Sequence, residues 1–112
     1  MKQLIAALLI CLAVSPAKAA QELDYTAIEL LDMCKSTYDT DYGYCAGYAL
    51  AIANVMSQGA TIGGYKACGH APFKSQQLIE IYVRYAERNP AIKSKDAMTS
   101  VAAAISSSFP CR

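Results

Sequence analysis

Apolar residues recur at helical spacing in four segments of the chain, namely residues 25–35, 44–57, 75–88 and roughly 96–109. In the first segment, Ala27, Leu31 and Cys34 repeat at spacings of four and three, which places them on one face of a helix. The fourth segment repeats in the same way at Met98, Val101, Ile105 and Phe109. No strand-like alternation runs for more than four residues. The pattern therefore predicts a small all-α domain of four helices.

The ends of these segments carry helix-start signals. Thr26 and Glu29 have the spacing of a capping box, and Asp24 is an alternative N-cap for the first helix. Asp96 or Ser94 is expected to cap the fourth helix. On the third helix, Glu80 and Arg84 are spaced for an i,i+4 ion pair.

The segment 44–57 is apolar almost all round, so it is expected to be the central, buried helix. Gly47 inside it costs about 1 kcal/mol of helix propensity relative to alanine, and a close helix contact would explain its presence. The polar residues 36–43 before this helix are expected to form a turn. Residues 58–73, which follow it, are rich in glycine and are expected to be an irregular connection.

Residues 1–19 have the pattern of a cleaved signal peptide. Lys2 precedes an apolar run over residues 4–14, which is too short to span a bilayer, and residues 17–19 fit a small-x-small cleavage site. Cleavage would leave one domain, residues 20–112. Cys11 could be a lipid acceptor, but its apolar neighbours favour an ordinary residue of the leader. We therefore expect export to the periplasm without a stable membrane anchor.

The charge of the mature chain limits its partners. The full chain has 10 basic and 9 acidic residues, and loss of Lys2 and Lys18 with the leader brings the net charge to about −1. This balance argues against binding to nucleic acid, which calls for a clustered basic surface.

Four cysteines follow the leader: Cys34, Cys45, Cys68 and Cys111. An even number of cysteines in a small exported domain indicates disulfides, and four cysteines allow three connectivities. Helices joined by a short loop lie antiparallel, which brings Cys68 near Cys111. Cys34 and Cys45 lie across a short turn. This placement favours the pairs Cys34–Cys45 and Cys68–Cys111.

Little in the chain suggests catalysis. Cys68-Gly69-His70 could belong to a metal site or to a thiol nucleophile, but His70 is the single histidine and no CxxC occurs. We expect no metal, no cofactor and no enzymatic activity. A small exported hydrolase or redox enzyme stays an alternative, and its mark would be a free thiol.

The chain has eight tyrosines and no tryptophan, and all eight tyrosines follow the leader. Tyrosine is favoured at protein interfaces because it buries a large area and keeps a polar tip. Tyr38, Tyr42 and Tyr44 lie in or beside the predicted polar turn. They could form a binding patch, or they could cap a small core while partly buried.

Several motifs occur in a recognisable order. Leu30-Leu31-Asp32-Met33-Cys34 is followed by Cys45-Ala46-Gly47-Tyr48, then by Cys68 and Pro72, a helix that ends near Asn89-Pro90, and a closing Phe109-Pro110-Cys111. In these motifs the chain resembles the type VI secretion immunity proteins of the Rap/Tai amidase-immunity family.

The resemblance implies a periplasmic, disulfide-bonded, all-helical protein, usually a homodimer. It would bind a peptidoglycan amidase toxin of the Cys/His type and occlude its active-site cleft with a helix and a loop. By analogy, the partner-binding residues would be Glu80, Arg84, Arg88, Asn89, Lys93 and Lys95. Subunit contact is expected through the second or third helix. The alternative is an exported helical chaperone-like or assembly protein without a toxin partner.

Overall fold

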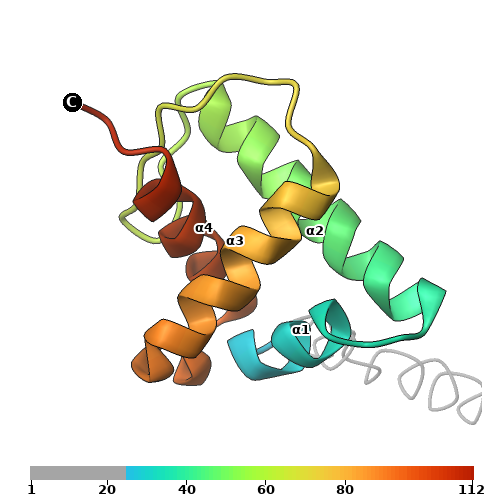
Figure 1. Ribbon diagram of the computed structural model, residues 1–112. Helices are drawn as coiled ribbons and strands as arrows, with labels where there is room; N and C mark the ends of the chain where they lie inside the picture. Colours follow the sequence, from blue (N-terminus) through green and yellow to red (C-terminus); the bar gives the residue numbers. More distant parts are fainter. Residues whose placement is uncertain (1–24) are drawn as a thin grey trace, which may run out of the picture.

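The computed structural model describes residues 25–112, which form a bundle of helices (Figure 1). The elements are α1 (Ala27–Cys34), α2 (Asp39–Ser57), α3 (Ser75–Arg88), the 3-10 helix η3 (Pro90–Ser94) and α4 (Ala97–Ser108). No strand occurs between residues 25 and 112, where only two isolated bridges form. The all-α prediction with four α-helices is confirmed. The expected signal peptide and the Asp24 cap lie outside the described residues.

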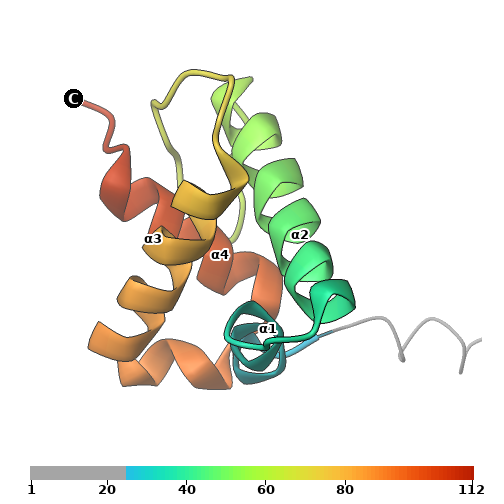
Figure 2. The same ribbon diagram turned by 45° about the vertical axis from the view of Figure 1, so that its right-hand side comes forward.

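The central helix is α4, and the prediction that the second helix fills this place is wrong. Figure 2 shows α4 crossing the middle of the bundle between α3 and α2. Its buried residues are Ala97, Ser100, Val101, Ala102, Ala103, Ala104 and Ile105. Alanine side chains keep this helix thin on every side, so neighbours can surround it closely. Met98, expected on its buried stripe, is instead 49% exposed.

Helix α2 begins at Asp39, five residues before the predicted start. Of the segment 36–43 that was expected to be a polar turn, residues 39–43 therefore belong to the helix and only residues 36–38 form the turn. Asp39 and Asp41 lie in that turn, where the positive end of the helix dipole favours carboxylates. Only one face of α2 is buried, through Cys45, Ala49, Ile52, Ala53 and Met56. The apolar residues on its other faces, such as Val55, remain exposed.

The first turns of α1 and α4 are joined to each other. The predicted capping box is present, since the Glu29 carboxylate accepts from the Thr26 amide at 2.9 Å and the Glu29 amide donates to the Thr26 hydroxyl at 3.3 Å. Of the two candidate caps for α4, Asp96 accepts from the Thr99 amide at 2.9 Å. This hydrogen bond lowers the pKa of Asp96. Thr26 and Asp96 also form an isolated antiparallel bridge, so the two caps fix each other.

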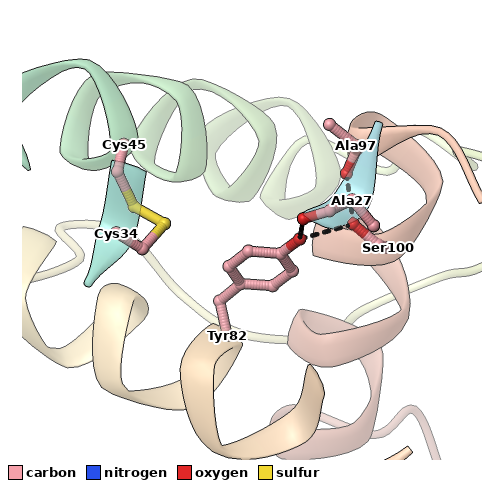
Figure 3. The surroundings of a disulfide bond; sticks show 6 residues. All are labelled: Ala27, Cys34, Cys45, Tyr82, Ala97 and Ser100. Atoms are coloured by element: carbon pink, nitrogen blue, oxygen red, sulfur yellow. Dashed lines mark hydrogen bonds between the residues drawn. A yellow bond between two sulfur atoms is a disulfide. The ribbon is translucent and has the colours of Figure 1, made fainter. Parts of the chain in front are cut away.

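Tyr82 connects three helices inside the core (Figure 3). Its ring is 1% exposed, and its hydroxyl donates to the Ala27 carbonyl of α1 at 2.9 Å. The same hydroxyl lies 2.9 Å from the Ser100 hydroxyl of α4, which reaches the Ala97 carbonyl at 2.7 Å. Burial raises the pKa of Tyr82, so the hydroxyl keeps its proton at neutral pH.

The two disulfides have the expected pairing. Cys34–Cys45 joins the end of α1 to the second turn of α2, with Cα atoms 5.1 Å apart and both residues buried (Figure 3). Cys68–Cys111 joins the connection after α2 to the C-terminal segment, with Cα atoms 4.9 Å apart. The pairs close loops of different length, with sequence separations of 11 and 43.

The connection from α2 to α3 is irregular, as predicted, and it packs against the C-terminal segment. The Cys68 amide donates to the Phe109 carbonyl at 2.8 Å, and the rings of Phe73 and Phe109 lie 5.6 Å apart. A Cβ atom on Gly69 would come within 2.9 Å of the Phe109 ring. Glycine is therefore required where this backbone passes the aromatic pair.

We expect Tyr82→Phe to lower the free energy of unfolding by about 1–2 kcal/mol, because a buried hydrogen bond is lost while the ring stays. Tyr82→Ala should lower the free energy of unfolding by about 3–5 kcal/mol, because it leaves a cavity in the core. Urea unfolding measures both. Tyr38→Phe is the matched control, since the Tyr38 side chain is exposed. A Tyr82→Phe protein as stable as the parent would show that the hydroxyl network contributes nothing.

Removal of Cys68–Cys111 by the double change Cys68→Ser and Cys111→Ser should cost about 4 kcal/mol, since a long loop is released in the unfolded chain. Both cysteines are exposed, so serine buries no new polar group. That loss is a large part of the stability of a small domain. Thermal melting under oxidising conditions is the measurement, and a variant that melts with the parent would contradict the expectation.

Candidate functional site

The exposed face of α3 carries most of the residues expected to bind a partner. The buried face of this helix consists of Leu78, Ile79, Tyr82 and Ala86. Helical periodicity then turns Glu80, Arg84 and Arg88 toward solvent, and all three are exposed. The sequence prediction of a solvent-facing charged stripe on this helix is confirmed; the role of the stripe in binding is a separate question.

A depression of about 300 Å³ lies where the C-terminal ends of α3 and α4 meet. Its lining residues are Ile81, Arg84, Tyr85, Arg88, Asn89, Ser107 and Ser108. The Asn89 side-chain amide donates to the Tyr85 carbonyl at 2.9 Å and so closes the last turn of α3. We call this depression the arginine pocket. It brings together Arg84, Arg88 and Asn89, three of the six residues expected to bind a partner.

The other three predicted residues lie outside the arginine pocket. Glu80 lines a neighbouring depression of about 370 Å³ together with Arg84, Glu87 and the end of α1. Lys93 lies in η3 and is half-buried. Lys95 caps η3, and its carbonyl accepts from the Ala27 amide at 2.9 Å. The two lysines therefore flank the same corner of the molecule without entering the pocket.

Neither arginine of the arginine pocket forms an ion pair with another described residue. Lys35 Nζ and Glu87 Oε1 form an ion pair at 3.1 Å, the single ion pair between residues 25 and 112. The predicted Glu80–Arg84 pair is not formed, so that expectation is wrong. Both partners are exposed, and an exposed i,i+4 pair stabilises by too little to hold two long side chains together. Arg84 and Arg88 consequently present two positive charges to solvent.

The residues considered for catalysis do not form a recognisable catalytic or metal site among the described residues. His70 is exposed in the connection before α3, beside the Cys68–Cys111 disulfide. Cys34, Cys45, Cys68 and Cys111 are all bonded in disulfides, so none of these four offers a thiolate. Between residues 25 and 112 no three His, Cys, Asp or Glu side chains gather in a way that could hold a metal ion. No helix in this range is long and apolar enough to cross a bilayer.

A second surface feature was only partly foreseen from the sequence. The rings of Tyr25 and Tyr44 lie 5.4 Å apart, and those of Tyr44 and Tyr48 lie 6.1 Å apart. Partial burial raises the pKa of Tyr44, and the nearby Tyr25 raises it further. Tyr38, Tyr42 and Tyr44 are each exposed, which favours a surface role over the alternative that they cap the core. The acidic side chains Glu29 and Asp32 of α1 line one depression with Tyr25 and Tyr38, which no pattern along the chain indicated.

The sequence model of the Rap1a immunity proteins matches residues 26–111. The match begins at the N-cap of α1 and ends at the last disulfide cysteine. The chain belongs to the Rap1a immunity protein family. No curated protein and no solved structure gives a significant match.

Membership of the Rap1a immunity family indicates that the surfaces described above are the places to look for functional residues. An immunity protein acts by binding a toxin, so its functional residues are expected on its surface rather than in an enclosed cleft. The arginine pocket and the tyrosine patch are both open surface features. The resemblance drawn from the cysteine and glycine-tyrosine motifs is thereby confirmed at the level of the family.

Proposed function

We propose that this chain is a periplasmic immunity protein that binds a type VI secreted peptidoglycan amidase and occludes its active site. The observation that carries the proposal is the Rap1a immunity match over nearly the whole described fold. The motif resemblance supplies the finer part, namely the class of toxin. Immunity of this kind needs no chemistry from the inhibitor, in keeping with four cysteines that are all disulfide-bonded.

The periplasm is the compartment that the covalent structure favours. Two disulfides persist in an oxidising compartment and are rare in a reducing cytosol. The signal-peptide pattern of residues 1–19 leads to the same compartment. Peptidoglycan lies there as well, so inhibitor and toxin would meet where the toxin acts.

The corner formed by α3 and η3 is the best candidate for the occluding element. It lies at one end of the molecule, at the lower left in Figure 1. Pro90 starts η3 directly after Asn89 has closed α3, which makes the corner stiff. A stiff corner loses little conformational entropy when it enters a cleft. Arg84 and Arg88 beside it would pair with carboxylates on the toxin.

We also propose a homodimer through the outer face of α2. The expected close contact of Gly47 is not made with any residue from 25 to 112, because a Cβ atom at Gly47 or at Gly43 would meet nothing there within 4 Å. Two glycines one turn apart thus weaken α2 with no compensating contact in the monomer. A second copy that packs against this face, beside the exposed Val55, would supply the contact.

The proposed immunity is tested by co-expression. A type VI amidase from the adjacent reading frame is directed to the periplasm with and without this protein, and lysis and co-purification are scored. We expect rescue from lysis and a stable complex. Lysis that continues despite expression of the folded protein, with every such amidase, would contradict the proposal and favour the chaperone-like alternative.

The double change Arg88→Ala and Lys93→Glu should weaken toxin binding by at least tenfold, because it removes two positive charges from the α3–η3 corner. Calorimetry with the purified toxin measures the affinity. The matched control is Lys66→Ala with Lys74→Glu, which makes the same change of charge at two other exposed lysines. Equal affinity of the two double variants would remove the corner from the interface.

Gly47→Leu should convert the dimer to a monomer without unfolding it, since the side chain has free space in the monomer but blocks a close helix contact. Light scattering at micromolar concentration measures the mass. Gln77→Leu, at an exposed position of α3, is the control and should leave the dimer intact. A wild-type protein that is already monomeric would contradict the dimer itself.

A further inference from the structure

The outer face of α1 and the turn into α2 enclose a groove of about 720 Å³. The residues that line it are Tyr25, Glu29, Asp32, Met33, Lys35, Ser36, Thr37, Tyr38 and Asp41. We call it the α1–α2 groove. It shares no lining residue with the arginine pocket, so it is a separate surface.

The apolar part of the α1–α2 groove is aromatic and accessible. The Tyr38 side chain is 72% exposed, the largest fraction among the exposed large apolar residues of the described chain. Tyr25 lines the groove and packs against Tyr44, which continues the row to Tyr48 along α2. Tyrosines anchored on one another present rigid rings, which lose little entropy when a partner covers them.

Carboxylates outnumber cations in the lining of the groove. Three carboxylates line it, and two of them are held in place: Glu29 by the Thr26 amide at 2.9 Å, and Asp41 by the Ser36 hydroxyl at 2.9 Å. Asp32 is exposed, and its carboxylate has no hydrogen-bond or ionic partner between residues 25 and 112. Lys35 is the one cation in the lining, and its Nζ is engaged with Glu87 at 3.1 Å.

The exposed tyrosine rings and the carboxylates of the groove together favour a positively charged ligand. An arginine or lysine side chain can lay its aliphatic stem and its cation on a tyrosine ring while its head group reaches a carboxylate. The residues that would precede Tyr25 in the mature chain include Glu22 and Asp24, which have the same sign as the groove. Charge complementarity therefore favours a cationic segment of another protein over this chain's own N-terminal residues.

We propose that the α1–α2 groove docks an arginine- or lysine-bearing segment of the toxin, as a second contact surface. The proposal rests on the proposed immunity function and adds the chemistry of the partner. With the arginine pocket on α3 and α4, the immunity protein then presents two surfaces of opposite charge. Such a pair fixes the orientation of a toxin and rejects toxins whose charges are arranged differently.

The first experiment uses a defined cation in place of the toxin. The isotopically labelled mature protein is titrated with tetra-arginine amide at low ionic strength, and amide shifts are followed by NMR. We expect the shifts to concentrate at the groove residues, such as Glu29, Asp32 and Asp41. Asp32→Asn should weaken binding at least threefold, whereas Gln76→Lys, which adds the same unit of positive charge at an exposed position of α3, should leave it within twofold. Shifts centred elsewhere, or equal effects of both variants, would overturn the proposal.

The second experiment uses the toxin identified by co-expression. Asp32→Lys should slow association at least tenfold at low salt, and the effect should shrink as salt is added. Tyr38→Ala should mainly speed dissociation, because it removes a ring from the contact. Toxin binding that tolerates both changes would overturn the groove assignment alone. A wild-type chain that binds no toxin would instead contradict the proposed function. The peptide titration alone would then show whether the groove binds a cationic segment.

Discussion

The hydroxyl of Tyr82 is the constraint on which the rest of the helical arrangement depends. It is a polar group in an otherwise apolar core, and a buried hydroxyl without a partner is costly. Its partners come from two other helices, the Ala27 carbonyl of α1 and the Ser100 hydroxyl of α4 (Figure 3). Helix α3 can satisfy its own buried tyrosine only when α1 and α4 are in register with it. The network therefore selects one packing among the many that an alanine-rich core would tolerate.

The covalent links act at the two ends of this core rather than inside it. Cys34–Cys45 fixes the short turn between α1 and α2, and Cys68–Cys111 fastens the C-terminal segment to the connection before α3. A domain of this size buries a modest fraction of its surface, so packing alone stabilises it little. The disulfides lower the entropy of the unfolded chain and thereby supply a substantial part of the stability. Because the disulfides stabilise the fold, its surface can carry charged groups that form no ion pair, such as the two guanidinium groups of the arginine pocket.

The distribution of charge follows from this scaffold and bears on recognition. In the arginine pocket, Arg88 lies in the last turn of α3, where the negative end of the helix dipole favours a cation. The α1–α2 groove lies at the first turn of α2, where the positive end of the dipole favours carboxylates. The same electrostatics that stabilise the helix ends thus separate positive and negative surfaces. For an inhibitor that must choose one toxin, such a separation is a source of specificity.

The four α-helices, the capping box of Thr26, the pairing of the cysteines and the family could all be predicted from the chain alone, whereas the 3-10 helix η3 was not. These depend on local spacing and on motifs that a reader can see along the chain. Which helix is central depends on packing between the helices, since α4 is surrounded because its alanines are small and not because its apolar stripe is wide. The tertiary structure also decided that Gly47 faces open space, that Glu80 and Arg84 stay apart, and that the carboxylates of α1 lie beside Tyr38. Each of these depends on the distance between side chains on neighbouring elements. Helical periodicity shows on which face of its helix a residue lies, but it does not show which residues of other elements pack against that face.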